Sequence, residues 1–550
     1  MAELVQGEKR VGLSARSARA LNAISPGVAS LALFAGGAGM LVSAVTPQIT
    51  DRVKLVAEIA PLGVIELSHF LGSLIATLML FLAYGVARRL AAARRAAIAL
   101  CLIAAPLSLL KGFVWEEALA LLVIAALLAV TREAYYRQSR LSAIRPTGWW
   151  IAAALAAVGM AGWAGFAAYE HIPYNDDLWW SFLIDGDVSR FLRALTGVGI
   201  VTGVILLWRY AGPMRPPRAC AADEAKALAI LASSERMDPQ AWLATTGDKT
   251  FLFSETGKSM IMYAAHGDAW IAMGAPAGLA DERRETIWRF REAADRANAW
   301  PAFYSVGPEL LPDLLDAGLV LQKVGETALV LLDAFVLEGA PRARQRQARA
   351  RGMRDGFVFS MEHVAPGSGL ARELRGVSDG WLKHHKGTEK GFSLGRFDEV
   401  YMSRMPVGVL RRNNVVEAFA NLWPGGPGGD VAIDLMRSRH DSPKGAMEVL
   451  FIELMLWAKA EGYRRFDLGM APLAGLENRR LAPWLSRIGA FVYRHGNAFY
   501  GFEGLREFKN KFDPVWEPRY LAAPDAWRLS AALGRTALLT AGGIRGMLKG

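Results

Sequence analysis

The sequence predicts a helical membrane domain followed by a soluble α/β domain. Of its 550 residues, 53% are hydrophobic and the mean hydropathy is +0.20, yet 21% are charged. The long apolar runs are confined to the first part of the chain. From about residue 220 the pattern changes to short strand-like runs and amphipathic helices, which is typical of an α/β fold. A chain of this length is expected to contain more than one domain.

Six apolar segments predict six membrane helices. A helix that crosses a bilayer core of about 30 Å needs roughly 20 apolar residues. The third and fourth segments are short and closely spaced. The segments are 27–46, 64–87, 96–111, 113–130, 149–169 and 193–209.

The distribution of arginines predicts the orientation of these helices. Arginines precede the first segment and follow the second, fourth and sixth segments. By the positive-inside rule, both chain ends and the soluble domain then lie in the cytoplasm. The net charge of +11 favours acidic partners such as anionic lipid or nucleic acid. Glu66 and His69 lie three residues apart in the second segment. They are either a functional ionisable pair or an interfacial pair that only contacts lipid headgroups.

Two similar successions of elements predict a duplicated soluble domain. Each reads strand, strand, helix, strand, first from residue 251 and again from residue 414. Because no sequence identity is visible between the copies, the argument is topological. The predicted divisions are a basic N-terminus 1–26, a membrane domain 27–210, soluble domains 220–340 and 356–525, an Arg-rich connecting helix 341–355, and a basic amphipathic tail 526–550.

The connecting segment 342–354 contains six arginines and no acidic residue. As a helix it would place Arg342, Arg346 and Arg349 on one face. Guanidinium groups pair well with phosphates, so this face is a candidate for binding an RNA backbone. The alternative is a solvated or headgroup-facing helix.

A strand-to-helix junction predicts an anion site. Residues 431–436 alternate as a strand, and the following helix is expected to start with Asp441 or Ser442 as its cap. The N-terminus of a helix attracts anions, and Lys444 and Gly445 lie beside it. The stretch is not a Walker P-loop, because no GxxxxGK[ST] motif is present.

Several longer runs make the chain resemble the bacterial aminoacyl-phosphatidylglycerol synthases, the multiple peptide resistance factor family. The runs are "PLGVIELSHFLGSLIATLMLFLAYGVARR", "EKGFSLGRFD", "IDLMRSRHDSPKGAMEVLF", "FDLGMAPLAG" and "FKNKFDPVWEPRYL". The resemblance implies a tandem acetyltransferase-like soluble part and a bacterial inner-membrane location. It also implies transfer of lysine, or next alanine, from aminoacyl-tRNA to phosphatidylglycerol, which reduces membrane negative charge and gives resistance to cationic peptides. Since the donor ester is already activated, no cofactor or metal is expected. The oligomeric state is left open, a homodimer included.

The resemblance assigns the first site residues to "DLMR". Asp434 would hold the donor amino group or orient the attacking hydroxyl, and Arg437 would hold a phosphate. Strict strand alternation puts them on opposite faces, so the strand must bend or end near Met436 if both point inward. An Asp–Arg pair that only fixes the strand end is the alternative. His385 is a candidate general base, and Glu389 is a candidate of the same kind.

Further cations of the family-like runs are candidate phosphate ligands. Lys509 and Lys511 would share a face if extended and, with Arg506, could bind lipid or tRNA phosphate. In the first copy the chain reads "MGAPAG", with Ala275 where the family commonly has an acid. Two other functions remain open: a membrane-anchored acyl-CoA-dependent acyltransferase, and a lipid flippase or sensor with an inactive soluble domain.

Overall fold

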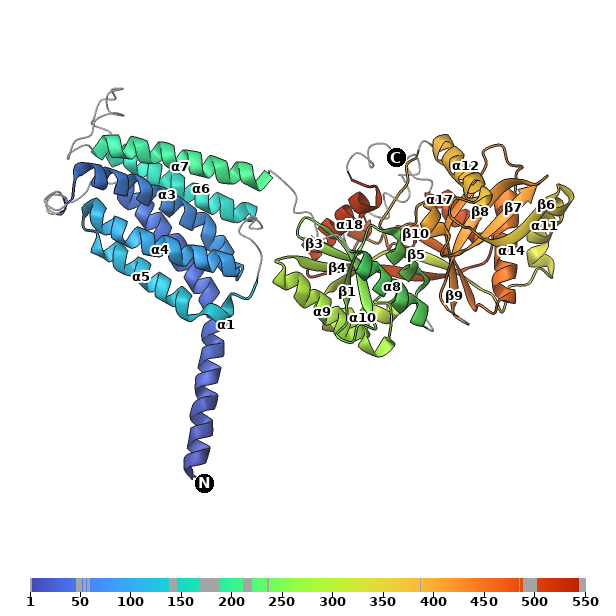
Figure 1. The fold of residues 1–550 in the computed structure, drawn as a ribbon, viewed down its shortest axis with the longest axis horizontal. Helices are drawn as coiled ribbons and strands as arrows, with labels where there is room; N and C mark the ends of the chain where they lie inside the picture. Colours follow the sequence, from blue (N-terminus) through green and yellow to red (C-terminus); the bar gives the residue numbers. More distant parts are fainter. Residues whose placement is uncertain are drawn as a thin grey trace. The chain divides into compact units, whose positions relative to one another are not determined.

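The structure, a computed structural model shown in Figure 1, divides into a helical unit up to Met214 and an α/β unit from Arg215, except that the short segment Asp295–Asn298 groups with the first unit. It describes residues 2–45, 52, 56, 60–137, 146–168, 187–210, 220–234, 237–385, 387–426, 428–483, 485–487 and 502–543. Each unit is described by itself.

Among the described residues of the helical unit, six α-helices lie at the positions of the six apolar segments, and a short 3-10 helix, Arg132–Ala134, follows the fourth of them. The six α-helices are α1 (Ala2–Val45), α3 (Leu62–Ala87), α4 (Ala91–Gly112), α5 (Trp115–Val130), α6 (Gly148–Ala168) and α7 (Asp187–Tyr210). By length and composition, α1, α3, α4 and α6 could each cross a membrane. Helix α5 has 16 residues, and the apolar part of α7 is the shorter Leu192–Leu206. The count of six spans therefore stays a prediction.

Small residues let the helices of this unit approach closely. A Cβ added to Gly37 of α1 would lie 2.9 Å from the Ala76 carbonyl oxygen of α3. A Cβ on Gly197 of α7 would lie 2.7 Å from the Phe70 ring of α3. Close approach of this kind maximises van der Waals contact between apolar helices. Helix α3 is consequently packed against both α1 and α7.

Charged side chains inside the helical unit are paired with one another. Glu66 is buried and pairs with Arg193 of α7, and His69 Nε2 lies 2.9 Å from the Lys111 carbonyl oxygen. The buried Lys111 ammonium lies 2.7 Å from Glu117. Ionisable groups among apolar helices are costly unless paired, so these contacts help to hold the bundle together.

The α/β unit is built on one eleven-stranded sheet with the order β1-β2-β3-β4-β11-β5-β10-β9-β8-β7-β6. Only β3–β4 and β9–β10 pair in parallel among the strands described. The strands are β1 (Thr250–Phe253), β2 (Met260–His266), β3 (Ala269–Met273), β4 (Trp300–Val306), β5 (Val320–Leu331), β6 (Phe357–His363), β7 (Pro406–Arg412), β8 (Val415–Pro424), β9 (Asp430–Ser438), β10 (Arg465–Pro472) and β11 (Val515–Ala523).

Helices cover both faces of this sheet (Figure 1). One apolar core lies under α8, α12 and α18 and runs across both halves of the sheet. On the opposite face, α9 and α10 cover the first half, and α11, α14 and α17 cover the second. The helices are α8 (Ala221–Ser233), α9 (Arg283–Arg296), α10 (Leu311–Asp316), α11 (Ala343–Arg354), α12 (Gly369–His384), α13 (Glu399–Met402), α14 (Ala446–Ala460), α17 (Phe502–Asn510) and α18 (Ala526–Thr540).

The two predicted successions of elements are present as β2-β3-α9-β4 and β8-β9-α14-β10, each with a parallel pair at its end. The sheet also joins them in a way that the sequence pattern does not indicate. Strand β11, from the end of the second copy, pairs with both β4 and β5 of the first. The C-terminal helix α18 packs on the same sheet through Leu529 and Ala532. The predicted domain divisions stay a prediction, since the strands of the two copies are interleaved.

Strand β9 leaves its parallel neighbour early and then bends. Its pairing with β10 ends at Ala432, so the two strands separate beyond that point. Its register with β8 shifts between Ile433 and Met436, where Asp434 and Leu435 both lie opposite Asn421. An extra residue of this kind is a β-bulge, which reverses the alternation of the side chains that follow. Asp434 and Arg437 therefore point to the same face of the sheet. The sequence analysis required a bend or an end of the strand near Met436 for this, and the bulge supplies it.

A second bulge, in β10, is closed by a buried lysine. The register of β10 with β5 shifts between Asp467 and Met470, and Gly469 has φ +85°. The Lys509 ammonium donates hydrogen bonds to the carbonyl oxygens of Gly469 and Met470 at 2.8 and 3.1 Å. Burial lowers the pKa of Lys509 to about 8, although the charge of Asp467 opposes the shift.

The expectation that Lys509 and Lys511 share an extended face is wrong. Lys509 lies in helix α17, which ends at Asn510, and it is only 3% exposed. The apolar residues of α17 pack beneath the sheet, which turns Lys509 inward and leaves Lys511 beyond the helix end.

The buried Lys509 gives a testable dependence of stability on pH. Between about pH 8 and pH 10.5 the unfolded chain keeps a proton on this lysine that the folded chain has released. The free energy of unfolding contributed by Lys509 therefore rises with pH in this window, by up to about 1.4 kcal/mol per unit. Between pH 8 and pH 10, we expect the free energy of unfolding of wild type to increase by about 2 kcal/mol relative to that of Lys509→Met. The measurement is urea unfolding of the full chain in detergent.

Lys511→Met is the matched control, because this lysine is partly exposed. The difference in the free energy of unfolding between this variant and wild type should not change with pH. An equal difference between wild type and Lys509→Met at both pH values would contradict the prediction.

Candidate functional site

The Asp434 carboxylate is held by three hydrogen-bond donors from three different segments. Oδ1 accepts from the Gly395 backbone N–H at 2.9 Å, and Oδ2 accepts from Tyr401 Oη at 2.7 Å and Asn421 Nδ2 at 3.0 Å. Burial raises the pKa of Asp434, although these donors and the charge of Arg437 act in the opposite direction. A carboxylate with fixed orientation and a raised pKa is suited to accepting a proton.

Two further residues fix the donors themselves. The buried Trp423 indole donates to Tyr401 Oη at 2.8 Å, which directs the phenol hydrogen toward Asp434. Burial and the neighbouring Asp434 raise the pKa of Tyr401, so its hydroxyl stays protonated. Asn421 Oδ1 accepts from the Leu435 N–H at 3.0 Å, so one amide both closes the bulge and binds the carboxylate.

The loop between α12 and α13 closes over Asp434. A Cβ on Gly395 would lie 2.0 Å from Asp434 Oδ2, so only glycine permits this approach. The preceding part of the loop is held from elsewhere in the unit. The Asp248 carboxylate accepts from the Phe392 N–H at 2.7 Å, and the Gly391 N–H donates to the Thr540 carbonyl oxygen of α18 at 3.0 Å. The loop that binds Asp434 thus depends on both halves of the sheet.

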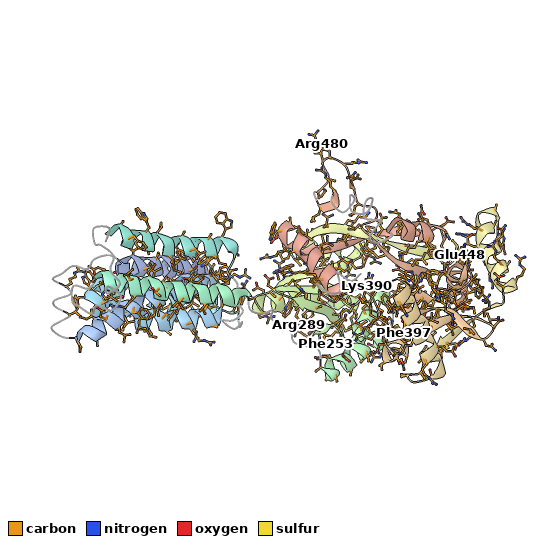
Figure 2. All side chains as sticks on the ribbon, turned by 90° about the horizontal axis from the view of Figure 1, so that it is seen from above. Phe253, Arg289, Lys390, Phe397, Glu448 and Arg480 are labelled. Carbon is orange, nitrogen blue, oxygen red and sulfur yellow. The ribbon has the colours of Figure 1, made fainter. Side chains whose placement is uncertain are left out.

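Arg437 is buried on the same face as Asp434 and is paired. Its two terminal nitrogens lie 2.8 Å from the two Glu389 carboxylate oxygens, and it also donates to Ser378. Its guanidinium carbon lies 5.5 Å from the centre of the Trp381 ring. Glu389 in turn accepts from the Phe397 N–H of the same loop at 3.2 Å (Phe397 is labelled in Figure 2). Three of the predicted catalytic residues, Asp434, Arg437 and Glu389, are therefore brought together.

Lys249 is a site neighbour that the sequence analysis missed. Its side chain is buried, and its ammonium lies 2.5 Å from Asp248 Oδ1 and 2.9 Å from Thr246 Oγ1. Burial lowers the pKa of Lys249, while Asp248 and Asp434 favour its charged form. No motif signals this lysine in the sequence, because its neighbours in space come from distant segments. Tyr401 and Trp423 were missed for the same reason.

Of the two predicted anion-site residues, Gly445 lines a pocket beside the Asp434 site and Lys444 is not in its lining. Lys444 and Gly445 are exposed just before α14, while Gly445, His385 and Lys511 line the pocket. The helix start at Asp441 or Ser442 is wrong. Gly445 is the N-cap, with φ +99°, because residues 441–445 form turns before the helix begins.

The predicted RNA-binding arginines have partners within the unit. Arg342 lies 2.9 Å from Asp513, and Arg349 lies 2.6 Å from Glu453. Arg346 donates to two backbone carbonyl oxygens at 2.6 Å. Arg506 lies 3.0 Å from Glu326. Binding of phosphate by these four arginines stays a prediction that would require them to exchange these contacts.

In the described part of the chain, no group of three or more His, Cys, Asp or Glu side chains could hold a metal ion. The arrangement offers one oriented carboxylate, one buried guanidinium and a buried ammonium near it. Such a set can bind a substrate with an amino group and a hydroxyl, accept a proton and stabilise a developing anion.

Comparison with known proteins places these residues in a named family. The family model "Phosphatidylglycerol lysyltransferase, C-terminal" matches residues 228–523. Phosphatidylglycerol lysyltransferases of Bacillus subtilis (strain 168) and Staphylococcus xylosus are 35% and 32% identical over 281 and 283 residues. Each match covers 51% of this chain and 33% of the relative, so the chain matches about a third of the relatives' length.

Two solved structures share the fold of the α/β unit. The DUF2156 C-terminal domain from Agrobacterium fabrum is 42% identical, with a TM-score of 0.53, and the match covers 59% of this chain and 99% of that one. L-PGS from Bacillus licheniformis is 35% identical, with a TM-score of 0.51, over 60% of this chain and 99% of that one. The predicted fold class, apolar helices followed by a soluble acetyltransferase-like α/β part, is confirmed. Since the family model covers more than half of the chain, the chain belongs to the phosphatidylglycerol lysyltransferase family of aminoacyl-phosphatidylglycerol synthases.

Proposed function

We propose that this protein transfers an aminoacyl group, lysine first and alanine next, from aminoacyl-tRNA to phosphatidylglycerol. The observation that carries the proposal is the convergence of Asp434, Arg437 and Glu389 on one face of the sheet, in a chain of this family. The relatives' names supply lysine and phosphatidylglycerol. The RNA donor follows from the resemblance drawn from the sequence and from the absence of an ATP-type phosphate loop in that sequence.

The reaction is an ester exchange. The lipid hydroxyl oxygen attacks the aminoacyl carbonyl carbon and forms the new ester bond. The bond between that carbon and the terminal ribose oxygen breaks, and the ribose oxygen leaves as a hydroxyl. Asp434 accepts the proton of the attacking hydroxyl and returns it to the leaving oxygen, a role that its raised pKa favours.

The cations of the site have complementary roles. The buried Arg437 guanidinium is fixed by Glu389 and stabilises negative charge that develops beside Asp434. Lys249 is a second buried basic group near Asp434; burial lowers its pKa, while the charges of Asp248 and Asp434 favour its protonated form. Glu389 positions Arg437 and does not itself need to touch the substrate.

The product changes the charge of the membrane. Phosphatidylglycerol is anionic, and an added lysine brings two positive charges, so the product carries net positive charge. Fewer anionic headgroups attract fewer cationic peptides. We place the helical unit in the bacterial inner membrane with the α/β unit in the cytoplasm, as the arginine distribution predicts.

The proposed reaction is tested by lipid analysis with labelled substrates. Full-length protein is incubated with phosphatidylglycerol and labelled lysyl- or alanyl-tRNA, and the lipids are separated by thin-layer chromatography. We expect a labelled lipid that disappears after ribonuclease pretreatment. We expect Asp434→Asn to lower the rate at least about 10³-fold, because the proton acceptor is lost while the shape of the side chain is kept.

Asp313→Asn is the matched control, since this carboxylate pairs with Arg283 in the first half and should leave the rate unchanged. A labelled lipid that forms equally in Asp434→Asn, or from an acyl-CoA donor instead, would refute the proposal.

The Tyr401 hydrogen bond gives a prediction on the pH profile. Because burial raises the pKa of Asp434, the acidic limb of kcat/KM should lie above pH 3.8. Tyr401 favours the ionised carboxylate, so Tyr401→Phe should raise this pKa further and move the acidic limb to higher pH, with kcat reduced about tenfold. The measurement is the pH dependence of single-turnover transfer. A limb that moves to lower pH, or does not move, would show that Asp434 does not set it.

A further inference from the structure

We propose that the pocket beside the Asp434 site binds the 3′-terminal nucleotide of an RNA. The inference rests on the proposed function, because it assigns a subsite to the RNA donor. The pocket has a volume of about 390 Å³ and is formed by the end of α12, the end of β9, the turn before α14, the start of α14 and the end of α17. A pocket of this size is within the range of small-ligand sites.

Five aromatic rings line this pocket, those of Trp381, His384, His385, His440 and Phe508. The rings of Trp381 and His385 are stacked with centroids 4.4 Å apart, and His385 Nδ1 lies 2.9 Å from the Trp381 carbonyl oxygen, which fixes its ring. The His384 ring lies 5.2 Å from that of His385 and is stacked on that of His440 at 5.9 Å. Stacking on Trp and His rings is the usual way in which proteins bind unpaired bases of RNA.

The other side of the pocket is suited to a phosphate. Helix α14 begins here after Gly445, and the first N–H groups of a helix attract anions. The Ser442 hydroxyl is buried against the pocket and has no hydrogen-bond partner among the described residues. Lys511 also lines the pocket, and its ammonium is held only loosely, 3.4 Å from Glu448.

The charges around the pocket are balanced without a ligand. Glu448, labelled in Figure 2, is the single acid among the described residues that line it, and Lys511 offsets it. Arg439 of the lining pairs with the exposed Asp441 at 3.1 Å. A phosphate would therefore draw Lys511 from Glu448 and would gain the helix N-terminus and the Ser442 hydroxyl as donors.

The pocket shares a wall with the Asp434 site. Trp381 lines the pocket, and its ring also contacts Arg437, which lies on the same face as Asp434. A nucleotide stacked on His385, whose ring lies on that of Trp381, is thus placed beside the residues proposed to act on the ester.

The rings favour RNA over a lipid headgroup as the ligand. A glycerophosphate headgroup could use the helix N-terminus and Lys511, but it has no π-face to place on Trp381, His384, His385 or His440. A terminal nucleotide uses both sides of the pocket. We therefore assign the pocket to RNA and treat a lipid headgroup as an outcome of the test.

The test measures RNA binding by the full chain in detergent. The probes are a dye-labelled RNA hairpin with an unpaired 3′-ACCA end and the same hairpin without these four nucleotides, followed by fluorescence anisotropy. The His384→Ala/His440→Ala double variant should raise the Kd of the first hairpin about tenfold, and leave the second within twofold. Lys511→Met should reduce the slope of the logarithm of the binding constant against the logarithm of the salt concentration by about one, the value of one phosphate contact.

His363→Ala is the matched control, because this exposed histidine lies on β6, away from the pocket lining, and should leave both Kd values unchanged. Steady-state transfer gives a second readout: the double variant should raise KM for aminoacyl-tRNA about tenfold and keep kcat within twofold. An unchanged Kd and KM for RNA in the double variant would overturn the inference. A loss of binding to phosphatidylglycerol vesicles, with RNA binding intact, would assign the pocket to a headgroup instead and overturn it too.

The two proposals can fail separately. If wild type forms lysyl lipid from a donor that resists ribonuclease, the proposed function fails. If wild-type transfer is sensitive to ribonuclease while the double variant binds and uses the RNA as wild type does, only the inference about the pocket fails.

Discussion

The β-bulge at Asp434 and Leu435 is the constraint on which the site depends. A regular strand would turn Asp434 and Arg437 to opposite faces of the sheet. With one extra residue in β9, both side chains face α12 and the loop that follows it. Asn421 stabilises this arrangement from the neighbouring strand, because its amide binds the Leu435 N–H and the Asp434 carboxylate at once. The same Asn421 side chain therefore stabilises both the bulge and the orientation of the Asp434 carboxylate.

The tandem arrangement has a physical consequence for this site. Asp434, Arg437 and Glu389 come from the second half of the sheet, but Asp248 of the first half holds the loop over them. The C-terminal helix α18 holds the same loop at Gly391. Strand β11 pairs across the boundary between the halves. The first half thus acts as a support for the site in the second, and the two cannot be separated without exposing sheet edges.

The elements of the two successions were predictable from their apolar runs and spacing, as in β8, β9 and α14, whereas β5, β6, β7 and β11 were not predicted. Asp434, Arg437 and Glu389 were predicted through family-like runs, but the bulge that brings the first two together has no signal in one sequence. Lys509 and Arg349 show the limit for charged residues. The sequence shows that both residues are charged. Their contacts depend on the fold: the apolar face of α17 turns Lys509 toward the Gly469 carbonyl oxygen, and Glu453 lies where it pairs with Arg349. Lys249 and Tyr401 act through contacts between distant segments, which periodicity cannot reveal.

The most direct test is a solved structure of the protein with a non-hydrolysable 3′-lysylamino nucleoside, in which an amide replaces the reactive ester. The account predicts that its carbonyl group lies against Asp434 and Arg437, on the face of β9 that the bulge creates. A carbonyl group bound on the opposite face, beside Met436, or a strand β9 without the extra residue, would contradict it.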